Sequence, residues 1–389
     1  MPILNRASEL QAEIAAWRRD IHEHPELNYD VVRTAAFAAA KLRDFGVDQV
    51  VEGLGRTGVV GLIKGSKGEG PVIGLRADMD ALPMTELTGK PWASKTPGKM
   101  HACGHDGHTA MLLGAARYLA ETRNFSGSVA VIFQPAEEGG GGGDAMVRDG
   151  MMERFGIQEV YGMHNLPGLE IGKFATRKGP IMASTDEFLI TVRGKGAHAA
   201  MPHRGVDPIV IAAQIVSALQ TIVSRVTDPF ESTVVTVTKF NAGTAMNVIP
   251  DEAHLGGTIR TLNAEQRSQA QTRLKEIVTG VAAALGADAD VRVHTGYPVT
   301  VNHGAQTDAA VRIAAEIAGA PNVDGEGSAM MGGEDFSYML NARPGNFIFI
   351  GNGDSAGLHN PRYDFNDEII PYGVSYWVKL AETRLAELG

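Results

Sequence analysis

The sequence has a single cysteine, Cys103, among its 389 residues, so no disulfide can form within the chain. Lys and Arg number 35 against 45 Asp and Glu, and the formal net charge of −10 argues against nucleic acids or anionic membranes as general partners. No apolar run approaches the roughly 20 residues that a membrane-spanning helix needs, and residues 1–20 lack the continuous apolar core of a signal peptide. We therefore expect a cytoplasmic protein.

Hydrophobic residues make up 44% of the chain, which is enough for sizeable cores, and the length suggests two or three domains. Apolar side chains recur at helical spacing in two N-terminal segments, 10–21 and 34–45. Short β-branched runs then alternate with a further helical stretch, in the order 59–63, 72–75, 109–121 (the helical stretch), 129–133 and 160–161. Strands that alternate with helices predict an α/β fold with a largely parallel sheet.

A different pattern occupies the middle of the chain. Its predicted elements follow the order β-α-β-β-α-β at residues 188–192, 208–224, 233–240, 253–262, 264–285 and 291–294. This order is that of the α+β ferredoxin-like unit. After residue 297 the first pattern resumes with helices and strands at 309–318, 347–350 and 372–388. We predict a mostly parallel-sheet catalytic domain at 1–183 and 297–389, interrupted by an inserted ferredoxin-like domain at 184–296.

Polar clusters stand where the predicted parallel strands end. Ligands of open α/β sheets bind outside the carboxyl ends of the strands. Four clusters follow strands and a fifth precedes a helix, at residues 76–80, 134–138, 162–165, 358–361 and 101–106. If the sheet is parallel, the side chains of these clusters lie close together in one pocket.

These clusters supply imidazoles, carboxylates and one thiol, a donor set that suits divalent transition metals. Cys103 and His105 are two residues apart, so both side chains can reach one ion. Glu137 and Glu138 can divide two tasks, one binding metal and the other acting as general base for a water molecule. A lone cysteine is usually a packing residue and a Glu-Glu pair is usually a solvated loop. Their coincidence at strand ends favours a metal site.

Six motifs together resemble the M20 metallopeptidase family. They are His24-Pro25-Glu26-Leu27, Arg76 to Pro83, His101 to His108, Gln134 to Glu138, Met163-His164-Asn165 and Gly332 to Phe336. The Cys103-Gly104-His105 form is similar to the subfamily of hippurate hydrolases, N-acyl-amino-acid amidohydrolases and auxin-conjugate hydrolases. The resemblance spans nearly the whole chain. It implies a zinc-peptidase-like catalytic domain with an inserted lid domain. The exposed strands of the inserted domain favour a dimer through that domain, although the sequence leaves the oligomeric state open.

The resemblance also implies a site with two divalent metal ions, which the donor types allow to be Zn, Mn, Co or Ni. The implied ligands are Cys103, His105, Glu138, His164 and His359. Glu137 is implied as the general base, and Asp80 as a carboxylate that orients a ligand or the base. Four further residues have no settled role, namely Asp78, Asp106, His24 and His108.

The resemblance also implies four residues that contact the substrate, three of them in the inserted domain and the fourth, Gly333, in the catalytic domain. His198 helps to bind the substrate carbonyl and stabilise the oxyanion, either in its own subunit or across a dimer. Asn247 and Gly333 contact the substrate, and the guanidinium of Arg260 grips its free carboxylate. Without the resemblance, a surface histidine, a turn asparagine and an exposed strand arginine are the simpler interpretations.

The sequence therefore predicts a metal-dependent amidohydrolase that splits N-acetyl or N-benzoyl amino acids into a carboxylic acid and a free amino acid. Three alternatives remain open. The first is a dipeptidase or carboxypeptidase of the same family. The second is a hydrolase with Cys103 as nucleophile, which full activity after chelation would favour. The third is a non-catalytic, metal-dependent binding protein, against which the presence of Glu137 argues, because binding alone needs no general base.

Overall fold

The structure, a computed structural model, describes residues 3–389, and the chain divides into two compact units. Unit 1 comprises the described residues up to Ile181 together with Val301–Ser328 and Asp335–Gly389, and unit 2 comprises Met182–Thr300 and Ala329–Glu334. The segment Ala329–Glu334 had been expected with the catalytic part of the chain. It belongs to unit 2 because the Ala183 N–H donates hydrogen bonds to carbonyls of this segment.

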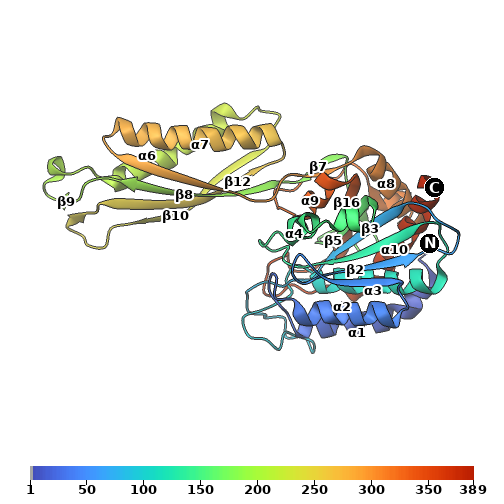
Figure 1. Ribbon diagram of the computed structural model, residues 1–389. Coiled ribbons are helices and arrows are strands. Elements are labelled where there is room, and N and C mark those ends of the chain that lie inside the picture. Colours follow the sequence, from blue (N-terminus) through green and yellow to red (C-terminus); the bar gives the residue numbers. More distant parts are fainter. Residues whose placement is uncertain (1–2) are drawn as a thin grey trace. The chain divides into compact units, whose positions relative to one another are not determined.

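An eight-stranded sheet forms the centre of unit 1, with strand order β1-β2-β4-β3-β5-β16-β6-β15 (Figure 1). The strands are β1 (Gln49–Leu54), β2 (Gly58–Lys64), β3 (Val72–Asp78), β4 (Ser128–Gln134), β5 (Ile157–Pro167), β6 (Phe174–Ala175), β15 (Val323–Asp324) and β16 (Gly345–Gly353). The central strands β4, β3, β5 and β16 pair in parallel, whereas β1 and β2 pair antiparallel. The predicted α/β fold with a mostly parallel sheet is confirmed.

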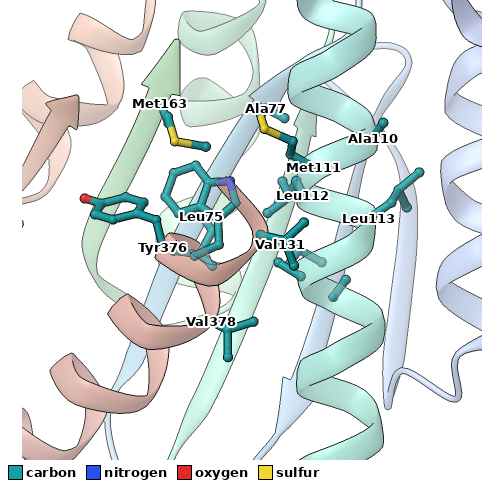
Figure 2. Close-up of a cluster of buried hydrophobic side chains, with 14 of the residues drawn as sticks. Leu75, Ala77, Ala110, Met111, Leu112, Leu113, Val131, Met163, Tyr376 and Val378 are labelled. Carbon is teal, nitrogen blue, oxygen red and sulfur yellow. The ribbon is translucent and has the colours of Figure 1, made fainter. Parts of the chain in front are cut away.

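Helices pack against this sheet. They are α1 (Asn5–Glu23), α2 (Val32–Asp44), α3 (His105–Thr122), α4 (Gly142–Arg148), α5 (Met151–Arg154), α8 (Gly304–Ala318), α9 (Phe336–Ala342) and α10 (Ile370–Leu388). One apolar core joins α1, α2, α3, α8 and α10 to the central strands. Figure 2 shows part of it, with side chains of Leu75 from β3, Met111 from α3 and Val378 from α10. Because 14 of its 18 residues are buried, α3 is fixed in place, and so is its N-terminus.

Unit 2 contains a four-stranded antiparallel sheet with strand order β10-β12-β8-β13. Its elements are β8 (Ser184–Arg193), α6 (Pro208–Thr221), β10 (Thr233–Ala242), β12 (Glu252–Thr261), α7 (Ala264–Ala284) and β13 (Asp288–Thr295). Alternate residues of β8 such as Phe188 and Ile190 are buried against both helices, which cover one face of the sheet (Figure 1). This chain order and strand order are those of a ferredoxin-like unit, as the sequence pattern predicted. Four short strands complete the chain, namely β7 (Gly179–Met182), β9 (Ala197–His198), β11 (Val248–Ile249) and β14 (Thr300–Asn302).

One helical stretch differs from expectation. Pro208–Val226, which is α6 with a following π-helical turn, has 19 residues and is long and apolar enough to cross a membrane by length and composition alone. The sequence does not predict a membrane-spanning length here, because the two glutamines of this helix interrupt the apolar run. Ile211, Ile215 and Leu219 pack into the core of unit 2, whereas Ile209, Val210 and Val223 are exposed. A single helix of this kind is a weak indication of a membrane span.

Candidate metal centre

The parallel strands of unit 1 bring the predicted polar clusters to one edge of the sheet. β3 ends at Asp78, which lies opposite Gln134 at the end of β4. His164 near the end of β5 lies opposite Phe349 of β16. The helix α3 begins at His105, four residues earlier than the spacing of its apolar residues predicted. The predicted convergence of the clusters from β3, β4, β5 and α3 is therefore confirmed.

Two groups of metal-binding side chains share one cysteine. In the first group Cys103 lies with His105 and His164, and in the second it lies with Glu138 and His359, with the donor atoms of each group within 4.8 Å of one another. Sγ of Cys103 is 3.3 Å from Nε2 of His164, and Nε2 of His359 is 3.1 Å from Oε1 of Glu138. All five predicted ligands therefore lie together, and Cys103 belongs to both groups.

The hydrogen bonds of His105 and His164 leave the same nitrogen of each ring available. Nδ1–H of His105 donates to the Asp80 carbonyl at 2.7 Å, and Nδ1–H of His164 donates to the Asn165 carbonyl at 2.7 Å. In the neutral imidazoles these bonds select the tautomer in which Nε2 carries the lone pair. Nε2 of His105 is buried and has no hydrogen-bond partner among residues 3–389. A buried imidazole lone pair without a donor fits a metal ion, and this observation supports the predicted donor set.

Gly104 makes the close spacing of Cys103 and His105 possible. Its φ angle is +95°, which side-chain-bearing residues rarely adopt, and a Cβ at this position would lie 2.2 Å from Oδ1 of Asn165. The chain can therefore turn from Cys103 directly into the first turn of α3. Any larger residue would displace either Asn165 or one of the two ligands.

The electrostatics of the cluster also suit a cation. Burial, together with the nearby charge of Glu138, raises the pKa of the Cys103 thiol. Hydrogen bonds to Cys103 and Glu138 raise the pKa of His359 to about 10. The Glu138 carboxylate thus attracts positive charge, and a divalent ion would supply it while holding the sulfur of Cys103 as thiolate.

Asp80 holds the backbone of the two adjacent glutamates. Its Oδ1 and Oδ2 accept hydrogen bonds from the N–H groups of Glu137 and Glu138, at 2.9 and 3.1 Å. The carboxylates of Glu137 and Glu138 also lie within 4.8 Å of a donor nitrogen of His105. Asp80 is therefore buried between the loop that carries both glutamates and the start of α3.

A second layer of polar residues, for which the sequence suggested no specific contacts, supports the ligands. Nδ1 of His108 hydrogen-bonds Oδ1 of Asp78 at 2.7 Å, and Nε2 of His108 accepts the Asn165 N–H at 3.0 Å. Nδ2 of Asn165 donates to the Tyr363 hydroxyl at 2.6 Å. His108 follows His105 by one helical turn and Asn165 follows His164 directly, so helical spacing could have identified His108. Nothing in the sequence indicated its link to Asn165.

Asp106 and His24, whose roles were open, bind other partners. Oδ2 of Asp106 is 2.8 Å from Nδ1 of His22. His24 is half-buried and hydrogen-bonds the Asp20 carbonyl, one turn earlier on α1, at 2.8 Å. Neither residue belongs to a group of ligand atoms found in the described part of the chain.

In unit 2, His198 and Asn247 lie together. His198 on β9 pairs with Val248 on β11, and the Ala199 N–H donates to the Asn247 carbonyl at 3.0 Å. Nδ1 of His198 accepts the Ala200 N–H at 3.1 Å, so the exposed Nε2 carries the proton and is a donor.

Arg260 and Gly333 form a second pair in unit 2. A Cβ built on Gly333 would lie 3.5 Å from Nη1 of Arg260. Arg260 pairs with Thr185 at the start of β8, whereas the chain reaches β9 only beyond Arg193 at the end of β8. Eight residues of strand separate these ends by roughly 26 Å. The two pairs of predicted substrate contacts therefore lie at opposite ends of the unit 2 sheet.

Comparisons with known proteins agree with this geometry. The sequence profile described as peptidase family M20/M25/M40 matches residues 74–383. The chain is 42% identical over 381 residues to a hippurate hydrolase of Campylobacter jejuni, covering 98% of this chain and 99% of that protein. It is 41% identical over 379 residues to thermostable carboxypeptidase 1 of Saccharolobus solfataricus, covering 95% and 94% of the two chains. A Bacillus subtilis structure described as a dinuclear metal binding peptidase from the M20 family has a TM-score of 0.85 and 35% identity, covering 97% of this chain and 99% of that one.

Proposed function

Because the chain belongs to the peptidase family M20/M25/M40, we propose that it is a metal-dependent amidohydrolase that cleaves the amide bond of N-acyl amino acids. The observation on which this proposal rests is that two groups of possible metal ligands share Cys103 and lie beside the Glu137-Glu138 pair. Hippurate is an N-benzoyl amino acid, so the relative named hippurate hydrolase supports an N-benzoyl substrate. A Bacillus subtilis relative named N-acetyl-L-cysteine deacetylase supports an N-acetyl substrate.

Two divalent ions are supported by the donor atoms and by the dinuclear Bacillus subtilis relative. One ion would be held by Cys103, His105 and His164, and the other by Cys103, Glu138 and His359. Bound at this site, such ions supply Lewis acidity, which lowers the pKa of water and polarises a carbonyl. The thiolate and imidazoles suit Zn, Co or Ni, and the carboxylate also suits Mn. We propose a cytoplasmic location, since Cys103 must stay reduced to act as a ligand.

The protein's own residues carry the proton and hold the substrate. Glu137 takes a proton from the attacking water as the water oxygen bonds to the acyl carbon, and later delivers that proton to the amine nitrogen, so that the C–N bond then breaks and the free amine leaves. Asp80 keeps the Glu137 backbone in place. Nε2–H of His198 donates to the substrate oxygen as negative charge develops, and one such donor contributes about 3 kcal/mol to lowering a barrier. Arg260 binds the free carboxylate through its planar fork of N–H groups.

We propose that the protein acts as a dimer through unit 2 and that His198 serves the site of the partner subunit. An N-benzoyl amino acid is no longer than about three extended residues, or roughly 10 Å. Arg260 and His198 of one chain lie at opposite ends of the unit 2 sheet, so they cannot contact the same substrate molecule. β10 is an edge strand, and the exposed side of α6 carries apolar residues such as Val210, which supports pairing of two copies here.

Carboxypeptidase activity is a second candidate, because the thermostable carboxypeptidase relative is nearly as similar as the hippurate hydrolase. Both substrates present a free carboxylate next to the scissile amide. The two substrates differ in the acyl group of the scissile amide, which is a simple carboxylic acyl group in an N-acyl amino acid and an amino acid residue in a peptide.

A substrate panel tests the proposed function. N-acetyl, N-benzoyl and indole-acetyl amino acids are compared with dipeptides, after reconstitution with Zn, Mn, Co or Ni. We expect higher kcat/KM for the N-acyl amino acids and loss of activity after exhaustive chelation, with recovery on adding metal. Higher kcat/KM for dipeptides would favour the peptidase, and full activity after chelation would exclude a metal mechanism. Binding of the panel without turnover would indicate a binding protein.

A further inference from the structure

The segment Glu26–Tyr29, part of which the sequence analysis singled out without a role, is tied to the residue after Asp80. The Glu26 carboxylate accepts hydrogen bonds from the N–H groups of Arg33 and Thr34 at 2.9 and 2.8 Å, and so caps the first turn of α2. The Glu26 carbonyl accepts the N–H of Ala81 at 2.8 Å. One end of the segment is therefore anchored on α2 and beside Asp80.

The other end of the segment contacts the loop that carries the glutamates. The Ala136 N–H donates to the Asn28 carbonyl at 3.1 Å. Both residues have left-handed backbones, with φ of 55° at Ala136 and 48° at Asn28. Such a conformation is unfavourable for alanine and persists only where its surroundings impose it. Ala136 is fully buried and directly precedes Glu137, so this strained residue sets the direction of the chain into the glutamate pair.

Tyr29 holds the same loop on the far side of the glutamates. Its hydroxyl donates to the Gly140 carbonyl at 2.7 Å. The ring is fixed in turn, with the Arg56 guanidinium 4.2 Å from its centroid and Thr57 Oγ1 donating to the Tyr29 carbonyl at 2.8 Å. Gly139, Gly140 and Gly141 follow Glu138 before α4 begins at Gly142, and glycine has the greatest backbone freedom of any residue type. The hydrogen bond from Tyr29 to Gly140 therefore restricts a loop whose glycines alone would leave the backbone free.

We propose that the segment Glu26–Tyr29 positions the general base, with Tyr29 as a positioning residue that acts through Gly140 on Glu137. Asp80 binds the N–H groups of the glutamate pair, while Asn28 and Tyr29 hold the residues on either side of it. The inference rests on the proposed function, which assigns the proton transfer to Glu137. It assigns the segment no contact with metal or substrate.

Tyr29→Phe tests this directly, because it keeps the ring on Arg56 and removes only the hydroxyl bond to Gly140. We expect kcat to fall about five- to tenfold, the size that loss of one hydrogen bond produces, while KM and the two equivalents of metal stay unchanged. Tyr118→Phe, at a half-buried tyrosine on α3, is the matched control and should keep wild-type kcat.

Gly140→Ala perturbs the same contact from the loop. A Cβ there would lie 2.5 Å from Cβ of Ala136 and 3.2 Å from Cε2 of Tyr29, so the loop must move away from both. Gly280→Ala, where a Cβ would meet nothing within 4 Å, is its control. If both variants act through one contact, the double variant should lower kcat no further than the larger single change. If the two substitutions instead disturbed the structure at separate places, their effects on kcat would be additive.

Three outcomes overturn the inference. These are a kcat for Tyr29→Phe equal to that of Tyr118→Phe, loss of bound metal together with kcat, and additive effects in the double variant. Glu137→Gln is measured in parallel. If Glu137→Gln keeps the wild-type rate, the proposed function fails and the inference with it. If Glu137→Gln is inactive while Tyr29→Phe matches its control, only the inference fails.

Discussion

Asp80 holds Glu137 through the main chain, because Oδ1 of Asp80 accepts the Glu137 N–H at 2.9 Å. The other oxygen of the same carboxylate accepts the N–H of Glu138 at 3.1 Å. One buried carboxylate therefore places both the proposed base and a proposed metal ligand. A carboxylate with two acceptor oxygens can do this, whereas an amide would offer one oxygen and one NH₂ group.

Asp80→Asn should therefore lower kcat by about 10- to 100-fold, the range typical of groups that support a metal site from outside. The amide NH₂ would face one of the two backbone N–H groups, and the glutamate pair would shift. Steady-state kinetics and metal analysis on the same preparation measure the effect. Asp149→Asn is the matched control, since its carboxylate also accepts a backbone N–H, that of Gly55, at 2.7 Å. Equal kcat for both variants would contradict the role of Asp80.

Glu137→Gln and Glu138→Gln should separate base from ligand. Glu137→Gln should keep two equivalents of metal and lose about 10²–10⁴ in kcat, the usual contribution of a general base. Glu138→Gln should lose metal as well, since its donor group with Cys103 and His359 would be incomplete. Metal content after dialysis and single-turnover rates distinguish the two. Full activity in both variants would exclude the proposed mechanism.

Much of the site could be predicted because its geometry follows from the fold. Parallel strands place their carboxyl ends at one edge, so clusters far apart in the sequence, such as those at Asp80 and Glu138, had to converge. The ferredoxin-like unit was predictable for the same kind of reason, since its alternating strands and periodic helices are long. Short strands such as β6 and β15 have two residues each, too few to show a period.

The contacts that support the site could not be predicted. The link from His108 to Asn165 joins residues 57 positions apart, and that from Asn28 to Ala136 is made by backbone groups that every residue has. Hydrophobic periodicity carries no information on such pairs. The roles of the unit 2 residues came from the family resemblance alone, because an exposed histidine or asparagine has no distinctive pattern.

Arg260→Ala should weaken binding of substrates with a free carboxylate. Loss of a charge-assisted pair costs about 1.5–3 kcal/mol, so KM should rise about 10- to 100-fold. The same N-acyl compounds with a carboxamide in place of the carboxylate serve as control substrates and should show little change. Arg260→Lys keeps the charge and loses the fork of N–H groups, so its KM for the carboxylate substrates should lie between those of the wild type and Arg260→Ala. An unchanged KM for the carboxylate substrates would remove the assigned role.

His22 should make stability depend on pH. Burial alone would lower the pKa of His22, and the charge of Arg18 acts in the same direction. The charge of Asp106 and the hydrogen bonds to Asp106 and Glu86 outweigh both effects and raise the pKa to about 9. Because the folded pKa lies above the unfolded value near 6.5, the stabilisation is complete below pH 6.5 and is lost as pH rises through about 9. It is on the order of 1–3 kcal/mol.

His22→Gln retains a hydrogen-bonding side chain and removes the titration. Urea midpoints of both proteins, measured from pH 6 to 10 with the same saturating metal, should differ most at pH 6 and converge towards pH 10. The direct neighbours Asp106, Glu86 and Arg18 are unchanged in the variant, so the difference reports His22. A constant gap over this range would show that His22 is not protonated in the folded protein.

Mixing two inactive variants should test whether His198 acts across a dimer. If His198 serves the site of the partner subunit, a mixed dimer of His198→Ala and Glu137→Gln has one complete site, with Glu137 from one chain and His198 from the other. Random assortment makes half of the dimers mixed, each with one working site of two, so activity should recover to about one quarter of wild type. The variants His198→Ala and Glu137→Gln alone should stay near background. A mixture of Glu137→Gln with Asp80→Asn, whose lesions lie in the same unit, should show no activity beyond that of its Asp80→Asn chains. No recovery after verified subunit exchange would exclude the proposal that His198 serves the site of the partner subunit.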